Sequence, residues 1–216
     1  MKYRIEDILK DVRVALDENG VCEPLVSISD NDTLLLDDLI RNKTVDAVRM
    51  VEVKAPGSML DEGVDFSEND LVWPSGVDGI GWAYLELPKD FLRLVYFKMS
   101  DWHRGVSEVI YPDNPLYSRQ KSKYSGVRGN PENPVCAIVT KPPYKVLECY
   151  SSNTAGKVSI EVARYLPVPE IDKDGQVSIC ELLYRPTIYY LAGIVLMALG
   201  DTRAENFINL SMNYMK

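Results

Sequence analysis

The sequence is poor in the residues that catalysis and metal binding most often use. It contains one histidine, His103, and four cysteines without a C-x-x-C pair. Histidine and cysteine are the usual protein ligands of zinc, so this composition argues against a metal centre. P-loop, dinucleotide-binding, HExxH and GxSxG motifs are also absent. We therefore expect a protein that is not an enzyme and that binds no cofactor or metal.

The sequence leaves two alternatives to this expectation, a histidine base and a pair of catalytic carboxylates. His103 beside Trp102 could act as a base, but no motif places a serine or cysteine to use it. A turn or surface position is favoured for it. A hydrolase that uses two carboxylates stays open, because carboxylates at catalytic spacing cannot be recognised in a sequence.

Long apolar runs are missing as well. The stretch from Pro186 to Gly200 is the most apolar, and it has too few residues to span about 30 Å of hydrocarbon at about 1.5 Å each. The opening residues MKYRIEDILKDV carry acids where a secretory signal would have its apolar region. We expect no membrane partner, and synthesis in a reducing cytosol.

Basic residues are scarce in the first part of the chain. The formal net charge is -8, and residues 1–80 hold 18 acids against 8 bases. Such a surface disfavours the binding of nucleic acid, because affinity for DNA comes largely from contacts of Lys and Arg side chains with phosphates. It would suit a surface that DNA passes without specific binding, although a solvated face that maintains solubility is the simpler interpretation.

Helical patterns occupy both ends of the chain. Apolar residues at three- and four-residue steps predict helices over 3–17 and from 29–32 to 56. From Pro186 to Gly200 nearly the whole circumference is apolar, so this helix must be covered by other parts of the protein. Gly200 can end it with φ > 0, and Thr202 with Glu205 forms a capping-box start for a last helix. That helix carries four candidate docking residues: Phe207, Leu210, Tyr214 and Met215.

The middle of the chain alternates with a period near two, which predicts short strands. The predicted strands are 82–88, 91–99, 106–112, 134–139, 144–151 and 157–167. No helix intervenes between them, so antiparallel connection is favoured. We predict an α+β fold in which the N- and C-terminal helices form a helical bundle with an inserted antiparallel β-sheet or small barrel. The expected domains are 1–56 with 179–216, and 57–178, with Trp73, Trp82 and Trp102 in the sheet core.

A long excursion over 112–134 interrupts the strands. It is rich in Pro and Gly and lacks periodicity, so we expect a contact loop outside the core. Its basic and aromatic residues could bind phosphates or single strands, but contact with a protein is favoured. The candidate contact residues are Tyr117, Arg119, Lys121, Lys123, Tyr124 and Arg128.

Two stretches carry a resemblance to a known family. They are LPKDFLRL, followed by a tryptophan, and LAGIVLMALGDTRAENF in the final helix pair. Together with the opening helices they resemble the head-to-tail adaptor proteins of short-tailed bacteriophages, the tail tubular protein A and tail accessory factor group. The 112–134 excursion and the acidic loop after Pro56 have no counterpart in that family.

The resemblance implies a function. In that family a helical bundle carries an inserted β-domain, and about a dozen copies form a ring between the portal and the tail, through which the genome passes. It implies a structural virion protein at the head-tail junction, assembled in the host cytoplasm. Its partners would be further copies of itself, the portal protein and tail or nozzle proteins. The alternative is a non-viral β-rich protein- or glycan-binding module on a helical base.

Overall fold

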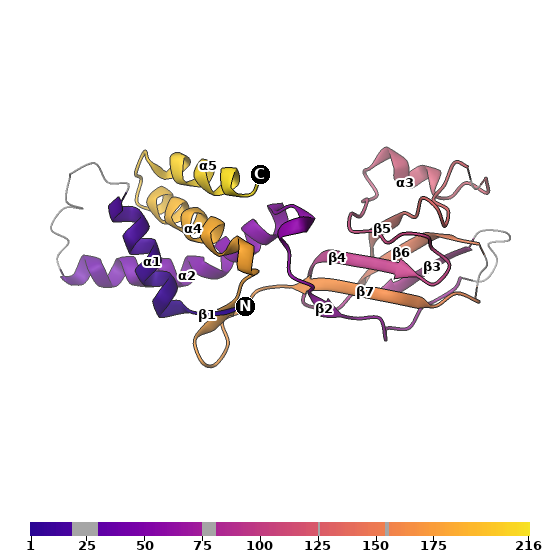
Figure 1. The fold of residues 1–216 in the computed structure, drawn as a ribbon, viewed down its shortest axis with the longest axis horizontal. Helices are drawn as coiled ribbons and strands as arrows, with labels where there is room; N and C mark the ends of the chain where they lie inside the picture. The colour runs from indigo at the N-terminus through magenta and orange to yellow at the C-terminus, as the bar shows by residue number, and fades with distance from the viewer. Residues whose placement is uncertain (19–29, 75–80, 125, 154–155) are drawn as a thin grey trace. The chain divides into compact units, whose positions relative to one another are not determined.

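The chain forms a mixed α+β structure that divides into two compact units (Figure 1). The computed structural model describes residues 1–18, 30–74, 81–124, 126–153 and 156–216. The first unit, called here the helical unit, combines Met1–Asp61 with Val168–Lys216. The second, called the β unit, is Glu62–Pro167. Within the described residues, every ladder between named strands is antiparallel.

The helical unit is organised around one central helix. It contains α1 (Ile5–Glu18), α2 (Asp30–Lys54), α4 (Tyr184–Ala198) and α5 (Ala204–Tyr214). Helix α4 packs against the other three and buries most of its circumference, as its all-round apolar pattern predicts. In the described parts of the chain, no helix is both long and apolar enough to cross a membrane.

The turn between α4 and α5 follows the sequence prediction only in part. Gly200 has φ of 75°, so α4 ends with a glycine in the left-handed region. The prediction of a capping box at Thr202 and Glu205 was wrong. The N-cap residue of α5 is Arg203, and its side chain makes no capping hydrogen bond. Instead the carboxylate of Asp201 accepts a bond from the backbone N–H of Arg203 at 2.8 Å.

Helices α4 and α5 approach each other closely at Gly193. A Cβ atom there would lie 2.7 Å from Cγ1 of Ile208, so a larger residue would push α5 away. The hydroxyl of Ser211 donates to the carbonyl of Pro186 at 2.7 Å. This buried bond fixes the register of the two helices.

Two short strands, neither predicted from the sequence, close the helical unit. Strand β1 (Lys2–Arg4) pairs with β8 (Gln176–Ser178). A tight turn precedes β8, in which the backbone N–H of Gly175 donates to the carbonyl of Asp172. The predicted domain limits at 56 and 179 are therefore corrected to 61 and 168: 168–178 joins the helical unit because β8 pairs with the first residues of the chain.

The β unit consists of two three-stranded sheets. One has the order β2-β7-β4, and the other has the order β3-β6-β5. Their bounds are β2 (Val64–Asp65), β3 (Gly81–Glu86), β4 (Phe91–Met99), β5 (Cys136–Lys141), β6 (Tyr144–Ser152) and β7 (Ile160–Pro167). The strand predicted at 106–112 was wrong, because Val106 and Ile110 make only isolated bridges, to Phe97 and Ala137.

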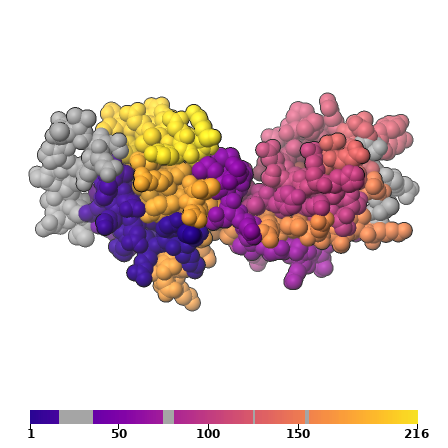
Figure 2. Space-filling model, viewed as in Figure 1, coloured from indigo at the N-terminus to yellow at the C-terminus, as the bar shows by residue number. Residues whose placement is uncertain are grey.

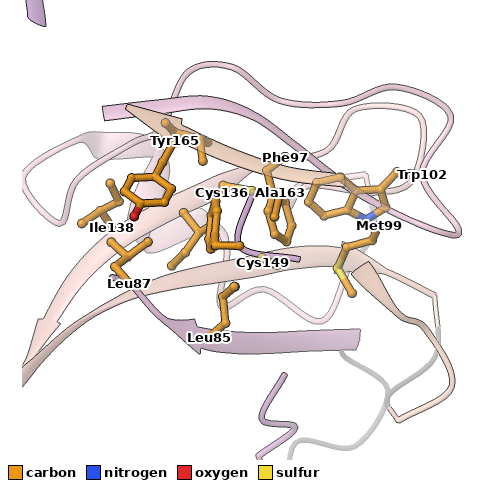
Figure 3. Close-up of a cluster of buried hydrophobic side chains, with 13 residues drawn as sticks. Leu85, Leu87, Phe97, Met99, Trp102, Cys136, Ile138, Cys149, Ala163 and Tyr165 are labelled. Atoms are coloured by element: carbon orange, nitrogen blue, oxygen red, sulfur yellow. The ribbon is translucent and has the colours of Figure 1, made fainter. Parts of the chain in front are cut away.

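Side chains from both sheets meet in one core (Figure 3). Phe97 and Met99 come from β4, and Leu85, Leu147 and Cys149 come from the other sheet. Cys136 and Cys149 face each other across β5 and β6 as buried free thiols. The core gives the β unit its own apolar interior, as expected of a part that folds by itself.

Of the three tryptophans, only Trp102 is buried in this core, where it packs edge-on against Phe97. Trp73 is partly buried against the same cluster. Trp82 does not belong to the core, which corrects the prediction for that residue. It is half-buried on β3, where it stacks on Tyr150 at 5.9 Å.

Candidate functional site

The 112–134 excursion is folded onto the β unit. A short helix, α3 (Pro115–Arg119), begins after Asn114, whose side chain accepts the N–H of Leu116 at 2.9 Å. Gln120 is 3% exposed, and its side chain accepts the N–H of Gly129 at 2.8 Å. We expected a contact loop outside the core, and none of the described residues of the excursion belongs to the core cluster of the β unit, yet buried polar side chains pack the excursion on that unit in place of the apolar face that its composition lacks.

A buried carboxylate pins α3 to the outer face of the sheet. Glu148 of β6 is 3% exposed and accepts hydrogen bonds from the hydroxyls of Tyr117, at 3.1 Å, and Tyr150. Its other oxygen pairs with Nζ of Lys141 at 2.7 Å. We call these four residues the Glu148 anchor. A buried carboxylate is tolerated when it is paired and hydrogen-bonded, and every partner here comes from the β unit itself.

The anchor also changes the acidity of its tyrosines. Burial raises the pKa of Tyr150 far above its ordinary value, and the hydrogen bond to Glu148 adds to this effect. Burial likewise raises the pKa of Tyr117. Both hydroxyls therefore remain protonated donors at neutral pH, which is the state that the bonds to a carboxylate require.

Lys141 links the anchor to two half-buried aromatic rings. Its Nζ lies 4.0 Å from the ring centre of Tyr84 and 5.1 Å from that of Trp82. A lysine ammonium over aromatic faces is attracted by their negative centres. Trp82 and Tyr84 thus form an aromatic surface on β3 that Lys141 partly covers.

The structure separates the six candidate residues of the excursion into two groups. Tyr117 belongs to the anchor, and Arg128 is 9% exposed with its guanidinium donating to the carbonyl of Tyr150. The prediction that Arg128 is a contact residue is therefore corrected. Arg128 is an internal residue whose guanidinium donates to backbone carbonyls. The remaining four are exposed and are called here the basic tip: Arg119, Lys121, Lys123 and Tyr124.

The candidate docking residues of the last helix are also divided. Phe207 and Met215 are 4% and 7% exposed, so both are corrected to interior residues of the helical unit. Leu210 is half-buried beside a small cavity of about 150 Å³. Tyr214 is 48% exposed and stacks on Tyr189 with 5.3 Å between ring centres. Figure 2 shows the yellow atoms of α5 lying on the orange atoms of α4. Leu210 and Tyr214 are therefore the members of the set that a partner could reach.

The helical unit contains a buried acid that was not predicted from the sequence. Glu52 of α2 is 4% exposed and accepts a hydrogen bond from the thiol of Cys180 at 3.7 Å. Burial raises the pKa of Glu52 to about 7. The sequence does indicate the burial of Glu52, because this residue lies four residues after Val48 and next to Val51, on the apolar face of its helix.

The described residues offer no arrangement with obvious chemistry. The side chain of His103 is exposed, and its backbone N–H donates to the carbonyl of Pro131. Among the residues that the structure describes, no three His, Cys, Asp or Glu side chains lie together as a metal site would need. The sequence matches no protein-family model and no curated protein.

Proposed function

We propose that this chain is a structural virion protein, a subunit of an adaptor ring that joins a phage portal to the tail. The observation that carries the proposal is the way the chain is divided: helices from both ends pack on α4, and an antiparallel β unit is inserted between them. The resemblance in sequence implies the same arrangement. We propose that α1, α2, α4 and α5 act as the helical bundle of such a subunit, and that about twelve copies close the ring.

The distribution of charge supports a channel role. The helical unit holds 19 acidic and 12 basic residues, a net charge of -7, whereas the β unit holds 13 and 12, a net charge of -1. Acidic walls repel the phosphates of a passing genome. In this proposal DNA moves through the ring without specific binding, and the protein has no catalytic turnover.

Two exposed surfaces are proposed as contacts with other virion proteins. The α5 surface around Leu210 and Tyr214 would face the portal. The basic tip would face the tail or nozzle proteins, because the anchor and Arg128 hold it in a fixed shape while its basic side chains are exposed and can pair with acids. A preorganised surface binds at a lower entropic cost than a flexible loop does.

The proposal is tested by the mass of the purified protein and by binding to purified portal and tail proteins. We expect a particle of many copies, either alone or on the portal. Changing Arg119, Lys121 and Lys123 to Glu should abolish tail binding and leave the thermal midpoint unchanged. Lys145→Glu with Lys157→Glu, two exposed bases elsewhere on the β unit, is the matched control. A monomer that binds neither portal nor tail would contradict the proposal.

A second candidate is a non-viral protein- or glycan-binding module. It is favoured by the rings of Trp82 and Tyr84, which stay partly exposed, since aromatic side chains are common contacts of binding surfaces. Screening the protein against a glycan array discriminates between the two functions. Binding that is lost in Trp82→Ala would support the module.

A further inference from the structure

Several segments of the helical unit converge on Ile179 and Cys180, between β8 and η2 (Glu181–Leu183). The amino group of Met1 donates to the carbonyl of Ile179 at 2.8 Å. The backbone N–H of Asp61 donates to Sγ of Cys180 at 3.4 Å. The thiol of Cys180 donates to Glu52, near the end of α2. This junction therefore ties residues 57–61, α2 and the first residues of the chain to the start of η2.

Two carboxylates meet at the junction. Glu52 is almost fully buried, whereas the side chain of Asp61 is 47% exposed. Asp61 accepts the N–H of Glu181 and pairs with the amino group of Met1, both at 3.4 Å. Two charged groups act on Glu52 here: Asp61 opposes its ionisation, and the amino group of Met1 favours it. Hydrogen bonds from Cys180 also favour ionisation, but burial outweighs both contributions.

We propose that Glu52 is a proton-operated latch that holds residues 57–61 on η2 while it is protonated and releases them when its proton passes to solvent. Ionisation places a second negative charge near Asp61, on a side chain that is only 4% exposed. Opening of the junction relieves this cost because it hydrates Glu52. Asp61 is the last residue of the helical unit, so the latch controls the segment that leads into the β unit. The inference follows from the helical unit alone and does not depend on the proposed function.

The size and direction of the pH effect on opening follow from the proton affinities of Glu52 in the closed and in the open junction. Its pKa is about 7 when buried and returns toward the ordinary value of 4.5 when the junction opens. Below the lower value both states are protonated, and above the higher value both are ionised. Opening therefore increases as pH rises between these values and then levels off. The total change is at most about 300-fold, the ratio of the two affinities.

Hydrogen exchange of the whole chain between about pH 5 and about pH 8, corrected for the intrinsic effect of pH, measures the opening. The reporters are the amides of Asp61 and Glu181, which both donate across the junction. We expect their opening constant to rise by at most about 70-fold over this range, because Glu52 of the open state is already partly ionised at about pH 5. Glu52→Gln should remove most of the rise. Glu181→Gln, a neutralised and exposed acid beside the junction, should preserve it.

The side-chain amide of Glu52→Gln could itself disturb the junction, so a second variant serves as a control. Glu52→Met fills a similar volume without a titratable group, and it should also show opening that is independent of pH. A rise with pH that persists in both variants overturns the latch. An equal rise at the amides of α4 would overturn it as well, because the whole helical unit would then be opening instead of the junction.

Discussion

Leu196 and Met197 are neighbours on α4 with opposite environments. Leu196 is 1% exposed and Met197 is 57% exposed. An aspartate at 196 would place an unpaired charge in the interior, at a cost of several kcal/mol against a total stability of about 5–15 kcal/mol for a domain. An aspartate at 197 would point to water and should change stability by less than about 0.5 kcal/mol.

Far-ultraviolet circular dichroism of the two variants tests this contrast. We expect Leu196→Asp to lose the helical signal of the helical unit, and Met197→Asp to retain it. Normal folding of Leu196→Asp would show that α4 is not the central buried helix of its unit. The sequence predicted this burial correctly, because apolar residues on every side of a helix leave no face that water can solvate.

Buried polar residues mark the limit of what the sequence could predict at the residue scale. Arg128 was assigned to an exposed contact by its charge, yet its guanidinium is bonded to the carbonyl of Tyr150, 22 residues away. Tyr117 bonds to Glu148 across 31 residues. Such pairings depend on which strands are neighbours, and composition carries no information about that.

At the scale of elements, the anchor is expected to hold the excursion in place. Glu148→Ala removes the acceptor of Tyr117 and the partner of Lys141. Hydrogen bonds to a charged group contribute about 1.5–3 kcal/mol, so α3 should detach more often. Limited digestion with trypsin, read by mass spectrometry, should then cut faster after Arg119, Lys121 and Lys123.

The control for this experiment is Glu132→Ala, since Glu132 is an exposed acid of the same excursion and belongs to no ion pair among the described residues. It should be cut at the rate of the unchanged protein. Equal cutting of the Glu148 and Glu132 variants would mean that other contacts, such as those of Gln120 and Arg128, are sufficient to hold the excursion.

The elements themselves were predicted unevenly. The predicted helix 3–17 corresponds to α1, because a long amphipathic pattern repeats its signal over several turns. Strands β1 and β8 have only three residues each and lie at opposite ends of the chain. Three residues carry too little pattern to detect, and their pairing becomes visible only when the ends are brought together. Residues 106–112 alternate as a strand should, but they meet neighbouring strands only at isolated bridges.

At the scale of the whole molecule, the chain crosses between its units twice, near residues 61 and 167. This topology is consistent with the predicted inserted β region, although the limits moved by several residues at each end. The sequence predicted an insertion because the spacing of apolar residues changes from a helical period to strand-like alternation and back. It could not give the limits, since residues 57–61 and 168–178 are held in the helical unit by contacts with residues distant in sequence: Asp61 bonds to Met1, Cys180 and Glu181, and β8 pairs with β1.

Two separate cores predict two separate unfolding transitions. All three tryptophans lie in the β unit, so their emission reports on that unit, whereas far-ultraviolet circular dichroism is dominated by the helices. In Leu196→Asp we expect the helical signal to be lost while tryptophan emission keeps its transition. Leu147, which is fully buried in the β unit, provides the converse: Leu147→Asp should abolish the tryptophan transition and leave the helices folded. If either substitution removed both signals together, the two units would be folding as one, and the division of the chain into independent cores would be refuted.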